Sequence, residues 1–132
     1  MKFAKRVFLI AGIFGLIVLV PLYFMEEKTG RDFPPAITHP EYYYGFVGVA
    51  VAWQVLFLVL ATDPRRYRPM MIPAALEKAA FSIPIFLLFF QGRVPFLMLV
   101  AALPDLLLCV LFIVAYLKTP RDYYLVNSAE IT

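Results

Sequence analysis

Residues 70–90 read MMIPAALEKAAFSIPIFLLFF, and residues 94–117 read VPFLMLVAALPDLLLCVLFIVAYL. Each stretch is apolar and, at a rise of about 1.5 Å per residue, long enough to cross a hydrocarbon core of about 30 Å as a helix. Only the three residues Gln91-Gly92-Arg93 separate the two stretches. Because this connection is so short, the sequence predicts an antiparallel helical hairpin here.

Two more apolar stretches precede this hairpin, and the composition of the chain agrees with them. Of the 132 residues, 63% are hydrophobic, and the mean hydropathy is +0.82. These values are too high for an ordinary soluble domain. We therefore expect an all-α integral membrane protein with a single domain over residues 1–132. The predicted fold is an antiparallel up-down four-helix bundle with spans at about 7–25, 44–61, 70–90 and 94–117.

The basic residues at the ends of these spans predict the orientation. Eight lysines and arginines fall on one side of the bundle, namely Lys2, Lys5, Arg6, Arg65, Arg66, Arg68, Lys118 and Arg121. The other side holds three, which are Lys28, Arg31 and Arg93. Loops on the cytoplasmic side of a membrane are enriched in lysine and arginine. We therefore expect a multi-pass protein of the inner (plasma) membrane with both termini in the cytoplasm.

Ionisable residues within the predicted spans are the strongest indication of a functional site. Glu77 and Lys78 lie in the third span, and Asp105 lies in the fourth. A charged side chain at the centre of a membrane helix costs roughly 2.5–3.5 kcal/mol, so such groups usually face each other or a wet cavity. Counted along the helices, Glu77 lies about 10 Å from one face and Asp105 about 15 Å from the other. Gln54 of the second span reaches a similar level, so we expect one polar cluster near the midplane.

Within this cluster, we expect an ion pair between Lys78 and Asp105 that leaves Glu77 with unused bonding capacity. Adjacent helical residues point about 100° apart, so Glu77 and Lys78 cannot both face one partner squarely. Trp53 is the neighbour of Gln54 in the second span, and its side chain either lines the cavity or faces lipid. The predicted ligand-binding residues are thus Gln54, Trp53, Glu77, Lys78 and Asp105. The opposing interpretation, a satisfied network that only fixes helix register, stays open.

Three prolines interrupt the predicted spans and favour a kinked helix pocket. Pro21, Pro84 and Pro104 each remove one backbone hydrogen bond from a helix. In a membrane the freed carbonyls need protein or water as partners. The connection at residues 26–41 is rich in proline and is predicted to be an irregular loop.

Several classes of site and partner are disfavoured. The chain has one cysteine, Cys109, and one histidine, His39, so neither a disulfide within the chain nor a usual metal-ligand spacing is present. We expect no metal and no cofactor. The net charge of +3 comes from residues beside the spans, and these do not form a soluble basic face for nucleic acid.

Short motifs at the span ends resemble a known group. Pro40-Glu41-Tyr42 enters the second span, Asp63-Pro64 leaves it, and Glu77-Lys78 lies in the third. In these features the chain resembles small four-span bacterial membrane proteins of uncharacterised families, loosely similar to the DoxX-like group. That resemblance implies a four-helix bundle in a bacterial inner membrane and brings no established activity.

Three functions remain open from the sequence. The first is a protein that binds or transports a lipophilic small molecule at the midplane, with membrane lipids around it. The second is an accessory or structural subunit of a larger membrane complex, or a homo-oligomer. The third is a membrane isomerase-like or cyclase-like enzyme that uses the paired carboxylates Glu77 and Asp105 as acid and base.

Overall fold

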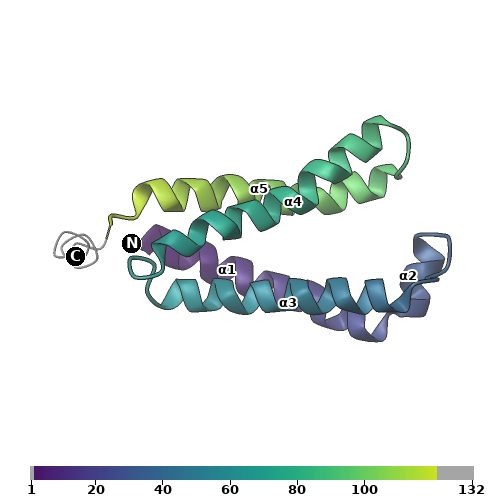
Figure 1. Cartoon of the computed structure of the whole chain (residues 1–132), viewed down its shortest axis with the longest axis horizontal. Helices are drawn as coiled ribbons and strands as arrows, with labels where there is room; N and C mark the ends of the chain where they lie inside the picture. The colour runs from purple at the N-terminus through teal and green to yellow at the C-terminus, as the bar shows by residue number, and fades with distance from the viewer. Residues whose placement is uncertain (1, 122–132) are drawn as a thin grey trace, which may run out of the picture.

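The computed structural model describes residues 2–121 and is helical almost throughout (Figure 1). Its elements are α1 (Lys2–Leu19), a 3-10 segment η1 (Val20–Phe24), α2 (Glu26–Asp32), α3 (Pro40–Thr62), a 3-10 turn η2 (Arg68–Met70), α4 (Met71–Phe90) and α5 (Phe96–Lys118).

Four of these segments are long and apolar enough to cross a membrane, as predicted. They are Lys2–Phe24, Pro40–Thr62, Arg68–Phe90 and Phe96–Lys118, each of 23 residues with a mean hydropathy between 1.6 and 2.7. The second begins four residues before the predicted start because proline fits the first turn of a helix, where its missing N–H is not needed.

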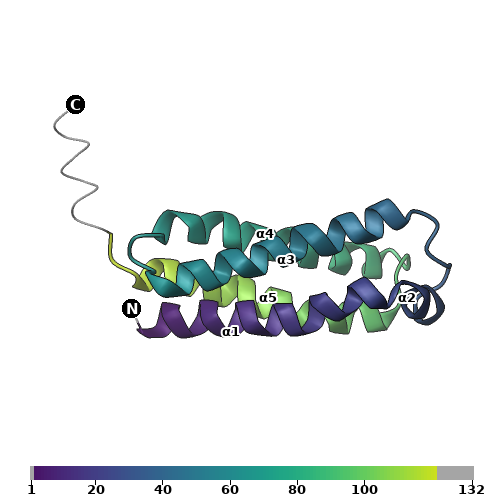
Figure 2. The same cartoon turned by 90° about the horizontal axis from the view of Figure 1, so that it is seen from below.

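The four long helices alternate in direction and form a bundle (Figures 1 and 2). The start of α1, the turn between α3 and α4, and the end of α5 all lie at one end. The α4–α5 connection and α2 lie at the other end. The up-down arrangement follows from short connections, which join helices that lie side by side.

Residues 26–41 differ from the sequence prediction because they include the short helix α2. Glu26 and Glu27 occupy its first turn and Arg31 its last, so the charges complement the helix dipole. The hydroxyl of Tyr44 also donates to Glu26 Oε2 at 2.8 Å, and the hydroxyl of Tyr43 donates to the Leu22 carbonyl at 2.6 Å. The first bond ties the start of α2 to α3, and the second ties η1 to α3 just before the connection begins.

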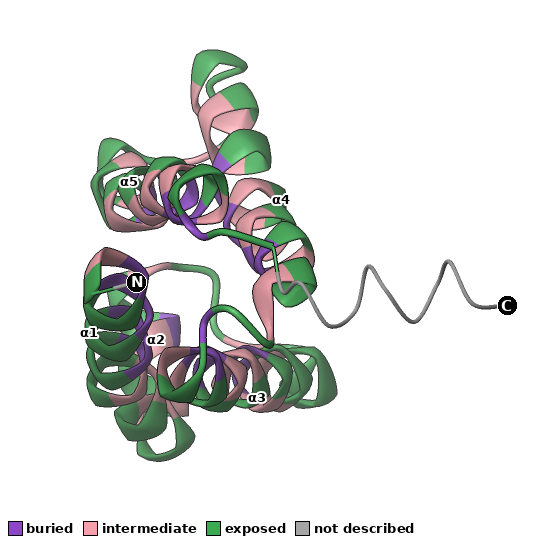
Figure 3. Cartoon of the chain, turned by 90° about the vertical axis from the view of Figure 1, so that its left-hand side faces the viewer, coloured by how far each residue is buried: buried purple, intermediate pink, exposed green. Residues whose placement is uncertain are grey.

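The main cluster of buried apolar residues lies toward the end of the bundle where α1 begins. Phe8, Phe57 and Phe112 are fully buried there and come from three different helices. The rings of Phe8 and Phe112 stack with centroids 4.4 Å apart, and Phe57 meets Phe112 edge-on at 4.9 Å. Seen along the bundle, the buried faces of the helices turn inward and the exposed faces turn outward (Figure 3). Exposed apolar faces on the outside are expected where lipid is the solvent.

The helices pack as two hairpins that are joined unevenly. The most extensive contacts are between α4 and α5 and between α1 and α3, while α1 and α5 make the main connection between the two hairpins. Contact between α3 and α4 is slight. Toward the α2 end, the far half of α4 turns away from α3 (Figures 1 and 3). Pro84 lies in this part of α4, at a position where proline removes a helix hydrogen bond.

Candidate functional site

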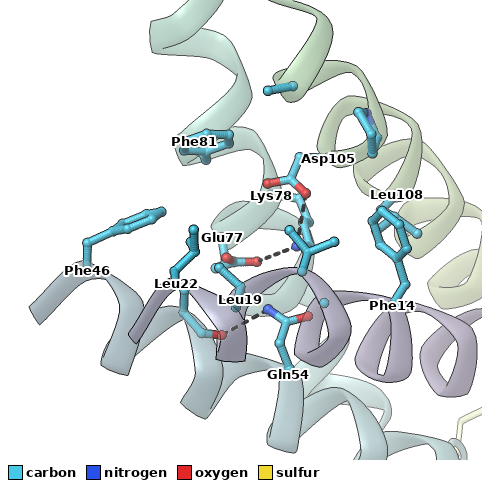
Figure 4. Close-up of a pocket in the computed structure, with 16 residues that line it drawn as sticks. Phe14, Leu19, Leu22, Phe46, Gln54, Glu77, Lys78, Phe81, Asp105 and Leu108 are labelled. Carbon is cyan, nitrogen blue, oxygen red and sulfur yellow. Dashed lines mark hydrogen bonds and ion pairs between the residues drawn. The ribbon is translucent and has the colours of Figure 1, made fainter. Parts of the chain in front are cut away.

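A cavity of about 260 Å³ lies between the two hairpins (Figure 4). All four long helices contribute to its wall, and most of the lining is apolar. The polar side chains in the lining are Gln54 of α3, Glu77 and Lys78 of α4, and Asp105 of α5. The structure thus brings together four of the five residues that the sequence singled out.

The Lys78 ammonium group is the centre of the charged cluster. Its Nζ lies 3.1 Å from Asp105 Oδ1, to which it donates a hydrogen bond, and 3.6 Å from Glu77 Oε2. It also lies 5.3 Å from the ring centroid of Phe57, close enough for a cation–π attraction. The Lys78 side chain is only 6% exposed. The expected Lys78–Asp105 ion pair is confirmed, and the flexible lysine stem also lets the ammonium group reach back to its neighbour Glu77.

Gln54 presents an acceptor to the interior of the bundle. The residue is 1% exposed, and its Nε2 donates to the Ala50 carbonyl one turn earlier at 2.9 Å. A carbonyl can only accept, so this bond fixes which end of the amide is nitrogen and leaves Oε1 as the other end. Within residues 2–121, the buried Gln54 Oε1 has no hydrogen-bond partner.

Glu77 provides a second acceptor of the same kind. Its side chain is 17% exposed, and the buried Oε2 accepts no hydrogen bond from the part of the chain that the structure describes. Its only charge partner there is Lys78, at the longer of the two ion-pair distances. A buried polar atom without a hydrogen bond costs about 1–3 kcal/mol, so two such atoms at one cavity need an explanation.

Gly15 of α1 allows the Gln54 side chain to occupy its position. A Cβ atom added to Gly15 would overlap the amide oxygen and carbon of Gln54. Glycine is therefore required here by a close approach between helices, as small residues often are in membrane bundles. The sequence contains this glycine but gives no sign of its partner, because the pairing of α1 with α3 is a tertiary feature.

Trp53 lies outside the cavity. It lines a separate groove between α3 and α4, which shares four lining residues with the cavity, namely Phe46, Ala50, Glu77 and Phe81. The rings of Phe46 and Phe81 stack across this boundary with centroids 6.1 Å apart. Sequence reasoning missed both phenylalanines, because one apolar residue in a membrane span looks like any other.

Of the three prolines that the sequence singled out, Pro104 lines the cavity, one residue before Asp105, whereas Pro21 and Pro84 are not among its lining residues. After Leu19, the helical hydrogen-bond pattern changes from α to 3-10 in the segment that contains Pro21.

The hydroxyl of Ser82 donates to the Lys78 carbonyl at 2.8 Å. This bond is made to the backbone of α4 and not to the side chains of the charged cluster.

Over residues 2–121, no group of three or more His, Cys, Asp or Glu side chains is placed to hold a metal ion. Comparison with protein-family models, with curated proteins and with solved structures finds no match to this chain. The resemblance to DoxX-like proteins therefore stays a prediction from short motifs.

Proposed function

We propose that the protein binds a lipophilic small molecule in the cavity between its two hairpins and holds it there or carries it across the bilayer. The observation that carries this proposal is the pair of buried acceptors, Gln54 Oε1 and Glu77 Oε2, at the wall of an otherwise apolar cavity. Ligand sites commonly combine an apolar lining with a few polar groups that fix orientation. Ionisable side chains within membrane spans are also rare, and they commonly mark functional sites.

The groove between α3 and α4 supports access from the lipid phase. It meets the cavity along Phe46, Ala50, Glu77 and Phe81, between α3 and α4, where the contact between the two helices is slight. Glu77 lines both the groove and the cavity, so a molecule that enters the groove from the bilayer already meets this side chain, and the rings of Phe46 and Phe81 border its way into the cavity. A lipophilic ligand therefore suits both the groove, through which it would enter, and the apolar cavity, in which it would bind.

For the membrane setting, we propose the inner membrane, with the start of α1 and the end of α5 in the cytoplasm. The lysines and arginines at the start of α1, in the turn after α3 and at the end of α5 belong to the same end of the bundle. Clusters of this kind mark the cytoplasmic side.

A cavity-filling variant tests the proposed function. Ala50 is 8% exposed and lines both cavity and groove, so Ala50→Phe should fill the site. Ala52 is exposed on the same helix, so Ala52→Phe adds the same bulk outside the site. Both variants and the wild type would be extracted from native membranes with a lipid-retaining polymer, and bound molecules would be identified by mass spectrometry.

We expect a small molecule other than bulk lipid, near one equivalent, from the wild type and from Ala52→Phe, and at least a tenfold loss from Ala50→Phe. Identical extracts from all three would contradict the proposal. Recovery of a stoichiometric protein partner without any small molecule would favour an accessory subunit of a larger complex.

A further inference from the structure

We infer that the ligand carries a protonated amine that binds between Glu77 and Gln54. This inference rests on the proposed function and narrows it to one ligand class, a compact lipophilic amine. It comes from the net charge of the polar cluster and from the two acceptors in the cavity wall that lack a hydrogen bond.

The side chains of the cavity wall carry more acceptor atoms than donor atoms. The donors are Gln54 Nε2, which donates to the Ala50 carbonyl, and Lys78 Nζ, which donates to Asp105. Within residues 2–121, the two buried side-chain atoms without a hydrogen bond are both acceptors, Gln54 Oε1 and Glu77 Oε2, and Glu77 Oε2 lies 3.6 Å from the Lys78 ammonium group. A ligand that satisfies them must bring hydrogen-bond donors.

The charge of the site selects a cation among the possible donors. Glu77 and Asp105 each contribute one formal negative charge and Lys78 one positive charge, so the ionised cluster sums to −2 + 1 = −1. In a site of low dielectric, an uncompensated charge is costly, and a cationic head group would balance it. An ammonium group also supplies several donors from one atom, whereas a hydroxyl supplies one. An anionic head group would meet like charge.

The apolar part of the ligand is limited by the volume. The cavity, at about 260 Å³, lies below the range of about 300–1,000 Å³ that is usual for pockets of drug-sized ligands. The site thus suits a compact hydrocarbon body with its head group toward Glu77. The view in Figure 4 has Glu77, Gln54 and Asp105 directed into the space that the aromatic rings of Phe14, Phe46 and Phe81 border.

Three probes with the same hydrocarbon cage test the head group: 1-adamantylamine, 1-adamantanol and 1-adamantanecarboxylate. The full chain would be placed in phosphatidylcholine nanodiscs, whose zwitterionic surface does not concentrate cations. Binding would be followed by calorimetry and by the fluorescence of Trp53, the single tryptophan of the chain. We expect the amine to bind on the order of tenfold more tightly than the alcohol, in line with a charge-assisted hydrogen bond, and the carboxylate to bind most weakly.

Two charge-matched variants locate the effect. Glu77→Gln should remove the advantage of the amine and leave the affinity for the alcohol unchanged. Glu41→Gln removes the same charge from an exposed position at the mouth of the groove and should change neither affinity by more than about twofold. Thermal unfolding of both variants would show that they remain folded, and the comparison of probes on the wild type needs no variant at all.

Failure of this inference can be told apart from failure of the proposed function. Equal affinity for amine and alcohol, with both lost in Ala50→Phe, would overturn the amine assignment and leave the lipophilic site standing. Equal effects of Glu77→Gln and Glu41→Gln would also overturn the assignment. Absence of saturable binding by all three probes would contradict both proposals.

Discussion

Lys78 is the residue that makes two half-buried carboxylates compatible with a membrane interior. A single acid at this depth would be costly, and two acids near each other would also repel. The ammonium group lies within 3.1 Å of one carboxylate and 3.6 Å of the other, so it compensates both. The net gain from such a pair over apolar packing is small, which argues that the cluster is kept for another reason than stability.

Removal of this lysine tests the compensation. Lys78→Met keeps most of the volume but leaves Glu77 and Asp105 without a cation, and we expect a loss of about 3–5 kcal/mol in the free energy of unfolding. The measurement is a denaturant titration of the purified protein in mixed micelles, followed by circular dichroism.

A second variant serves as the control for this prediction. Lys78→Met combined with Asp105→Leu removes one of the stranded carboxylates and should recover part of the lost stability. If the double variant is as unstable as the sum of the two single variants, the two residues are not coupled and the interpretation is wrong.

At this scale the sequence predicts the charged residues well and their surroundings poorly. Glu77, Lys78, Asp105 and Gln54 stand out because polar groups are rare in membrane spans, and counting along each helix brings them to one level. Trp53 drew attention only as a neighbour of Gln54 and lies in the groove. Gly15 could not be matched with Gln54, because helix rotation and pairing depend on packing that no local pattern records.

Among the elements, the turn from α3 to α4 is held to the end of α5 by one side chain. Arg68 Nε donates to the carbonyls of Thr119 at 2.7 Å and Tyr116 at 3.2 Å, and its guanidinium lies 3.8 Å from the centroid of the Tyr116 ring. The last carbonyls of a helix lack partners within that helix. Arg68 therefore caps α5 and also fixes where α4 begins beside it.

Loss of this cap should be measurable. We expect Arg68→Ala to lower the free energy of unfolding by about 1–3 kcal/mol, since hydrogen bonds from a charged donor are lost. Arg68→Lys should restore only part of this, because an ammonium group cannot reproduce the planar fork and its stacking. Arg65→Ala, at an exposed position of the same turn, should stay within about 0.5 kcal/mol of the wild type. A loss in Arg65→Ala equal to that in Arg68→Ala would contradict the capping role.

The four long helices were predictable because their lengths and apolar composition leave little choice in a bilayer. Helix α2 was not, since its seven residues are too few and too polar to give a periodic signal. The bond from Tyr44, which lies 18 residues further along the chain, holds the start of α2 at Glu26. The weak contact between α3 and α4 was equally hidden, because short connections indicate neighbours but not how closely they pack.

For the whole molecule, the orientation in the membrane is the prediction that most needs a direct test. In a Cys109→Ala background, single cysteines at Arg66 and Arg93 would probe the two ends of the bundle in intact cells. We expect Arg93→Cys to react with a membrane-impermeant maleimide from outside, and Arg66→Cys to react only after the cells are opened. The reverse pattern would contradict the proposed placement of the termini.

The uneven joining of the two hairpins also makes the shape of the protein depend on occupancy. The α1–α3 and α4–α5 hairpins are in contact near Phe8 and Phe112 and move apart toward the end of the bundle that holds α2. A ligand bound in the space between them contacts both pairs of helices, so its binding free energy opposes their separation. The free energy of unfolding then rises with the logarithm of the ligand concentration once this concentration exceeds the dissociation constant. A shift in the melting temperature can therefore be used to screen for the natural ligand.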